Sequence, residues 1–199
     1  LIGICLIVLN VFTQGIYKRF DLTSDNRYTL SEATLDIVKS AEEPIIVDVF
    51  LEGDFPSEFR RLQDETRQLL DEFSDKNNNI KFSFINPIED ESVRDQNLDL
   101  LNQRGLTPMR LNVQENGKSS EEIIIPWALA SYGETTVEIP LIKNKIGANQ
   151  QELVNNSVQH LEYAFTDGFS KLLNPKSRKI AVLRGNGQLE NKYVADFVT

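Results

Sequence analysis

The stretch that decides the fold is IIVDVFLEGDFPS, residues 45–57. Its first part, from Ile45 to Leu51, is rich in β-branched side chains, which is typical of a strand buried on both faces. The part from Gly53 to Ser57 contains Gly, Asp and Pro, the residue types that favour turns. The sequence therefore predicts a strand that runs through a tight turn into the next element.

That next element is expected to be a helix, because apolar side chains recur at helical spacing over residues 59–73. Charged pairs such as Arg61/Glu65 stand at i, i+4 on the other face, where we expect them to be solvated. Residues 80–84 then alternate like a half-buried strand, and a short helix is expected over residues 93–101.

A further helix is expected upstream of the strand, over residues 30–40. Thr29-Leu30-Ser31-Glu32 has the spacing of a capping box, in which the Thr29 hydroxyl and the Glu32 carboxylate bind free amides at the helix start. Pro44 ends this segment, because a proline disfavours helix in the residue before it.

Downstream, the spacing of apolar residues changes to that of strands. We expect a β-meander over residues 109–142, with strands at 109–114, 122–132 and 135–141. Asn116-Gly117 is a hairpin signal, and Pro126 favours an edge or a bulge in the second strand. Trp127 and Tyr132 are either core residues or part of a contact surface.

The longest amphipathic pattern covers residues 150–173 and predicts a helix that packs in its own domain or lies across a partner chain. Lys179 to Leu183 is expected to begin a new buried strand. The chain stops soon after it, at Thr199, so we expect the sequence to continue beyond this end.

The other end of the chain is apolar on all sides of a helical wheel and carries no charge before Lys18. Such a run is typical of a membrane-spanning helix, although about 17 residues are slightly short for a span. Because the chain begins with Leu1 rather than Met, we expect upstream residues to complete the span. A cleavable signal peptide, for which Thr13-Gln14-Gly15 is a poor cleavage site, and a buried core helix are the alternatives.

Composition excludes several classes of function. The 199-residue chain has a net charge of −9, which disfavours binding to nucleic acid. One cysteine and one histidine leave no pair for a disulfide, a zinc site or a thiol redox centre. Asp48 is expected to be hydrogen-bonded to the backbone or to face a wet edge, with a buried acid of shifted pKa as the alternative. His160 is expected to pack or to lie at the solvent edge of its helix, so we predict no catalytic residue, no metal site and no cofactor.

The order strand, helix, strand, helix and meander resembles a thioredoxin-like domain, an α/β fold in which helices flank a mixed sheet. In this resemblance Asp54 and Ser57 stand where thioredoxins carry their two cysteines, and only Pro56 of that motif is retained. Thr107-Pro108 stands where they carry a cis-proline. Disulfide exchange needs a thiolate, so the resemblance implies a scaffold without redox chemistry. We expect Asp54 to cap the helix instead.

Three stretches resemble the GldG family, the auxiliary membrane components of gliding-motility ABC transporters. They are residues 19–31 (RFDLTSDNRYTLS), residues 49–56 (VFLEGDFP) and residues 157–172, which open with SVQHLEY. Residues 179–187 resemble the start of the family's second extracytoplasmic domain. The chain has no Walker motif, so ATP hydrolysis is expected to reside in another chain.

This resemblance implies the domain organisation and the partners. The expected parts are a transmembrane anchor at 1–20, a thioredoxin-like domain at 21–149, a connecting helix at 150–175 and the start of a second α/β domain at 176–199. The anchor would lie in the cytoplasmic membrane with the body on the periplasmic side. The implied function is that of a non-catalytic accessory subunit bound to a permease and, through it, to an ATPase, with a homo-oligomer as a further option. The alternative is a periplasmic module that binds a solute or peptide in a cleft beside Pro108.

Overall fold

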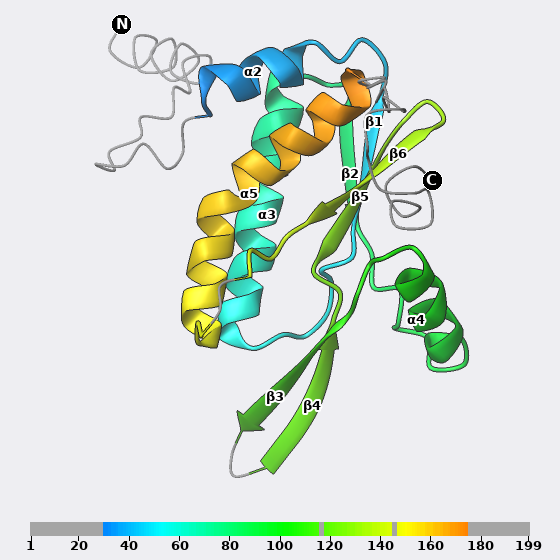
Figure 1. Ribbon diagram of the computed structural model, residues 1–199, viewed down its shortest axis with the longest axis vertical. Coiled ribbons are helices and arrows are strands. Elements are labelled where there is room, and N and C mark those ends of the chain that lie inside the picture. Colours follow the sequence, from blue (N-terminus) through cyan, green and yellow to red (C-terminus); the bar gives the residue numbers. More distant parts are fainter. Residues whose placement is uncertain (1–29, 116–117, 145–146, 175–199) are drawn as a thin grey trace, which may run out of the picture.

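The computed structural model describes residues 30–115, 118–144 and 147–174 (Figure 1). The helices in this part of the chain are α2 (Glu32–Lys39), α3 (Ser57–Lys76), α4 (Arg94–Gln103) and α5 (Gln150–Leu173). The strands are β1 (Ile45–Val49), β2 (Ile80–Phe84), β3 (Met109–Glu115), β4 (Lys118–Ile124), β5 (Trp127–Tyr132) and β6 (Thr135–Pro140).

Four of the strands form the central sheet, in the order β2-β1-β5-β6. β1 is parallel to β2 and antiparallel to β5, and β5 is antiparallel to β6. α3 and α5 lie side by side over one face of this sheet with α2 across one end, while α4 lies on the other side (Figure 1). The expected α/β class, with helices flanking a mixed sheet, is confirmed.

The expected meander differs from what the structure contains. β3 and β4 pair with each other in a separate two-stranded sheet, so the expectation of one meander over residues 109–142 is wrong. The strand expected over residues 122–132 is divided at Pro126, which has no N–H to donate to a ladder. There the Trp127 amide bonds to the Ile125 carbonyl at 2.8 Å, and the chain changes from one sheet to the other.

β1 is buried on one face only, which corrects the expectation of a strand buried on both. Ile45, Val47 and Val49 are fully buried beneath the helices, whereas Ile46 on the opposite face is 44% exposed. A run of β-branched residues has the same composition in either case, so the pattern could not distinguish them.

Two helix starts also differ from expectation. The N-cap of α2 is Ser31, whose Oγ accepts a hydrogen bond from the Thr34 amide at 3.2 Å; Thr29 lies outside the described residues. The N-cap of α3 is Pro56, which makes no side-chain cap bond. Asp54 precedes this N-cap by two residues and is exposed, so its predicted role as the N-cap is wrong.

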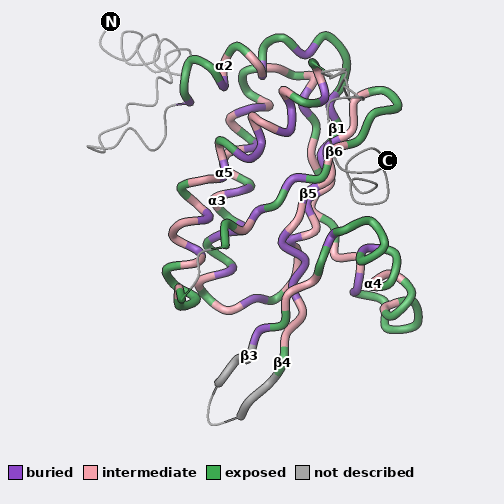
Figure 2. The backbone as a smooth tube through the Cα atoms, in the orientation of Figure 1, coloured by how far each residue is buried: buried purple, intermediate pink, exposed green. Residues whose placement is uncertain are grey.

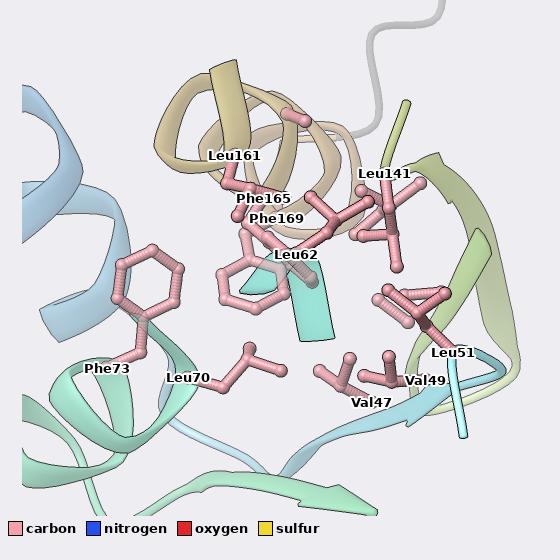
Figure 3. Close-up of a cluster of buried hydrophobic side chains, with 14 of the residues drawn as sticks. Val47, Val49, Leu51, Leu62, Leu70, Phe73, Leu141, Leu161, Phe165 and Phe169 are labelled. Atoms are coloured by element: carbon pink, nitrogen blue, oxygen red, sulfur yellow. The ribbon is translucent and has the colours of Figure 1, made fainter. Parts of the chain in front are cut away.

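The main core lies between the sheet and the pair α3 and α5 (Figures 2 and 3). Phe73 of α3 packs edge-on against Phe165 and tilted against Phe169 of α5, with ring centroids 6.4 and 5.7 Å apart. α5 has the predicted bounds and packs within its own domain. A smaller cluster around Leu101 and Leu106 joins α4 to the other face of the sheet, where Trp127 packs against it.

No helix within the described ranges has the length and apolar character needed to cross a membrane. The predicted anchor at residues 1–20 lies outside those ranges, as do the predicted strand at 179–183 and the second domain at 176–199. These three stay predictions.

Candidate functional site

The first candidate site is the junction between β1 and α3, where the sequence resemblance places the lost cysteines. Leu51 and Phe55 are buried and hold the connecting loop against the core. Gly53 has a φ of +153°, and a Cβ there would lie 3.1 Å from the Phe55 ring, so a larger residue would strain the loop. Asp54 is exposed, and the Ser57 hydroxyl donates to the neighbouring Glu58 carboxylate at 3.0 Å. The junction is thus an ordered turn, and the two positions that resemble the cysteines of thioredoxins hold the carboxylate of Asp54 and the hydroxyl of Ser57.

Glu52 fixes this loop to α3 through side-chain contacts. Its Oε2 accepts hydrogen bonds from Gln63 Nε2 at 3.0 Å and from Arg67 Nη2 at 3.2 Å. The Arg67 guanidinium also lies 3.8 Å from the centroid of the Phe84 ring on β2. These groups hold one another in place, and Glu52 Oε2 is occupied by two donors.

The proline that precedes the strand beside β1 is Pro126 rather than Pro108. Pro108 leads into β3, and no peptide bond in the described part of the chain is cis, so the expected cis-proline at this position is wrong. Pro126 is buried directly before β5, and its carbonyl accepts a hydrogen bond from the Leu141 amide at 2.9 Å.

Asp48 lies half-buried on the open face of the sheet, where its carboxylate accepts a hydrogen bond from Ser83 Oγ at 2.7 Å. The expected backbone hydrogen bond is not the one found, and β1 lies inside the sheet rather than at its edge. The partner is a side chain of the adjacent parallel strand.

A second candidate site is a hollow of about 340 Å³ between the loop after β6 and the first half of α5. It is lined by Lys143, Asn144, Asn156, Gln159 and His160. His160 Nδ1 lies 3.4 Å from the Lys143 ammonium, and the imidazole stacks on the Tyr163 ring with centroids 4.9 Å apart.

Burial in this hollow lowers the pKa of His160 below its ordinary value, and the Lys143 ammonium lowers it further. Both effects favour the neutral form of the imidazole. His160 lies at the solvent edge of its helix, as expected, but the pattern of α5 alone did not reveal its neighbour Lys143. The two residues are 17 positions apart and on different elements.

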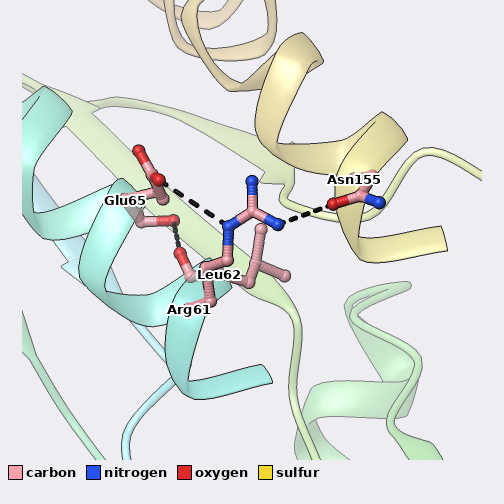
Figure 4. A network of polar contacts seen from close by, with 5 residues as sticks. Arg61, Leu62, Glu65 and Asn155 are labelled. Atoms are coloured by element: carbon pink, nitrogen blue, oxygen red, sulfur yellow. Dashed lines mark hydrogen bonds and ion pairs between the residues drawn. The ribbon is translucent and has the colours of Figure 1, made fainter. Parts of the chain in front are cut away.

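Polar contacts also join the helices. Arg61 of α3 reaches Asn155 Oδ1 of α5 at 2.6 Å and lies 3.8 Å from Glu65 Oε1 (Figure 4). Arg61 is therefore an interhelix contact as well as the surface residue that its spacing predicted. Further along α5, Glu162 Oε1 accepts from the Thr34 hydroxyl of α2 at 2.6 Å. The described residues contain no group of three or more His, Cys, Asp or Glu side chains that could hold a metal ion.

The family comparison matches residues 24–131, more than half of the chain, to a model described as a domain of unknown function, DUF7088. The chain belongs to the DUF7088 family. No curated protein and no solved structure matches the sequence.

The DUF7088 match covers the described elements from α2 to the end region of β5 and so includes the β1–α3 junction. It ends before β6 and α5, and the hollow at His160 lies outside it. The β1–α3 junction therefore lies inside the matched family domain, and the hollow at His160 lies outside it.

Proposed function

We propose that this DUF7088 chain is a non-catalytic, membrane-anchored accessory subunit of a gliding-motility ABC transporter. In this proposal residues 1–20 form a single anchor in the cytoplasmic membrane, and the body lies on the periplasmic side. The chain binds a permease and, through it, a cytoplasmic ATPase. The resemblance of residues 19–31, 49–56 and 157–172 to the GldG family supports these partners.

The proposal includes a redox-inactive thioredoxin-like scaffold. Its support is the arrangement of the central sheet, in which β1, α3 and the parallel β2 are followed by the antiparallel pair β5 and β6 and then by α5. Such a β-α-β unit followed by a β-β-α unit is the arrangement expected of that fold. The β3–β4 hairpin is an insertion before the second unit.

The observation that carries the non-catalytic part is the chemistry of the β1–α3 junction. An exposed carboxylate at Asp54 and a hydroxyl at Ser57 stand at the helix start, where disulfide exchange would need a thiolate. Neither group can form a mixed disulfide.

The β3–β4 hairpin supports a role in assembly. Leu111 and Ile124 anchor its base in the main core, and the rest of the hairpin extends away from the body (Figure 1). Within the described chain, β3 and β4 pair only with each other. The outer edge of each strand is therefore unpaired within the described residues, and an unpaired edge is a template for pairing with another chain, so we expect a partner chain to cover it.

The test is affinity purification of the full-length tagged protein from its native membranes in a mild detergent. The expected result is that a permease and an ATPase are enriched with it. The same enrichment is expected for the double variant D54A/S57A, because the proposal assigns no chemistry to these side chains. Isolation of the chain without either subunit would contradict the proposal, and dependence of the enrichment on Asp54 and Ser57 would contradict the expectation that these two side chains have no role in assembly.

A further inference from the structure

We propose that the hollow between the loop after β6 and α5 binds a compact oxyanion, a phosphoryl or carboxylate group, through Lys143 and His160. This inference is independent of the proposed transporter role. It concerns a site on the part of the chain that the family match does not reach.

The lining of the hollow consists of hydrogen-bond donors without an acid. Asn156, Gln159 and His160 stand at i, i+3 and i+4 on α5, so they share one face of the helix. Lys143 and Asn144 come from the facing loop. An ammonium, an imidazole and three carboxamides can all donate a hydrogen bond, and none of these side chains carries negative charge.

Lys143 is a cation without a carboxylate partner among the described residues. It shares this with several other described cations, such as Lys39 and Lys81, but among the lining residues of the hollow it is the one cation. In a chain with a net charge of −9, an unpaired ammonium beside an acid-free hollow is a local site of positive potential. Hydrogen bonds to an ionised acceptor are stronger than those to a neutral one, which favours an anion over a neutral ligand.

The contact between Lys143 and His160 also fixes the position of the imidazole proton. An ammonium has only donors, so the His160 Nδ1 atom 3.4 Å from it must be the acceptor. In this arrangement a neutral ring would carry its proton on Nε2. His160 therefore offers a second N–H donor beside the ammonium.

The surroundings position the backbone of Lys143 and the ring of His160. The Lys143 amide donates to the hydroxyl of the buried Ser157 at 2.9 Å, and that hydroxyl donates in turn to the Leu153 carbonyl at 2.7 Å. This ties the loop to α5 at the base of the hollow. Stacking on Tyr163 restrains the His160 ring. The His160 donor therefore loses little freedom when an anion binds, whereas the exposed Lys143 side chain is ordered on binding.

The experiment uses His160 as its own reporter, because it is the one histidine in the chain. The full chain in a neutral detergent is titrated with inorganic phosphate, at constant pH and at an ionic strength held constant with chloride. The proton NMR signal of the imidazole is followed. The expected result is a saturable shift with a dissociation constant on the order of 1 mM. No saturable shift with phosphate or with acetate would overturn the proposal.

The variant K143Q and the matched control K171Q separate a site from a general charge effect. Both remove one positive charge, but Lys171 is paired with Asp167 and does not line the hollow. We expect K143Q to weaken phosphate binding about tenfold or more and K171Q to leave it unchanged. Equal binding by K143Q and the unaltered chain would overturn the proposal, as would an equal loss in both variants.

A further pair of titrations identifies the source of the oxyanion. Bicelles that contain phosphatidylglycerol are compared with bicelles of phosphatidylcholine alone. A Lys143-dependent shift that is larger with phosphatidylglycerol than with free phosphate supports a lipid headgroup as the ligand. A response to free phosphate or acetate that phosphatidylglycerol does not reproduce supports a small soluble anion. A lipid response that is the same in K143Q overturns the site.

Discussion

Replacement of Gly168 by alanine is the sharpest test of how α5 packs on the sheet. A Cβ at this position would lie 2.6 Å from Cδ1 and 2.7 Å from Cγ1 of Ile139 on β6. Ordinary carbon–carbon contacts are about 3.5–4.0 Å. Ile139 is itself 1% exposed, so it has little room to move away.

Two effects of opposite sign determine how much G168A changes the free energy of unfolding. Alanine is favoured over glycine inside a helix by about 1 kcal/mol. Overpacking of a buried site costs about 1–3 kcal/mol. We therefore expect G168A to lower the free energy of unfolding by about 1 kcal/mol in the unaltered background.

The effect of G168A on the free energy of unfolding should change sign when Ile139 is also shortened. I139A removes both clashing atoms, at a cost of about 2–5 kcal/mol for the cavity. In that background the added methyl group has room, so G168A should raise the free energy of unfolding by about 1 kcal/mol. If I139A is too unstable to measure, I139V removes Cδ1 at a lower cost of about 0.5–1.5 kcal/mol and should make the effect of G168A less unfavourable.

The assay is urea unfolding followed by the fluorescence of Trp127, the one tryptophan in the chain. The difference between the effects of G168A in the two backgrounds isolates the contact between positions 168 and 139. If G168A stabilises the chain by about the same amount in both backgrounds, α5 does not approach β6 as described, and the packing argument is refuted.

Two other groups give direct predictions. K143A should raise the pKa of His160 towards its ordinary value, because the repulsion by the Lys143 ammonium is removed. The pKa is measured by NMR titration, and an unchanged value would show that Lys143 does not act on the ring. The pKa of His160 is lower in the folded chain than its unfolded value of about 6.5, so the unfolded chain binds the proton more readily. The contribution of His160 to the free energy of unfolding is therefore complete above about pH 6.5 and is lost as the pH falls through the folded pKa. H160Q should remove this part of the pH dependence in urea unfolding, and an identical pH profile would contradict it. E162A should lower the free energy of unfolding by about 1–3 kcal/mol and speed hydrogen exchange in α2, because the buried Thr34 hydroxyl loses an acceptor. The control E162Q keeps an acceptor oxygen and should have a smaller effect. Equal stability of both variants and the unaltered chain would contradict a role of Glu162 in holding α2 to α5.

Much of the central fold could be predicted from the sequence, because its elements are marked by local periodicity. The long apolar stripes of α3 and α5 extend over several turns, and the bounds of α5 agree with expectation. The class follows from the alternation of these helices with short apolar strands.

The parts that could not be predicted depend on contacts between distant segments. Pro126 signalled an irregularity, but only the packed sheet decides that the chain leaves one sheet and enters another there. The first residue of α3 could not be predicted from the capping preference of Asp54, because the helix begins directly after Pro56 and has no side-chain cap bond.

The hollow at His160 escaped sequence analysis for the same reason. Lys143 reaches it because Ser157 fixes the loop after β6 to α5. No spacing rule within a helix or a strand brings these residues together. The one usable signal was the lone histidine beside amide side chains on a helix face.

The central claim is that this chain works by joining other subunits at a membrane. The measurement that tests it most directly is native mass spectrometry of the complex extracted from native membranes through a tag on this chain. The proposal predicts one assembly whose mass includes this chain, a permease and an ATPase. A spectrum that contains only this chain, as single copies or as homo-oligomers, would contradict it.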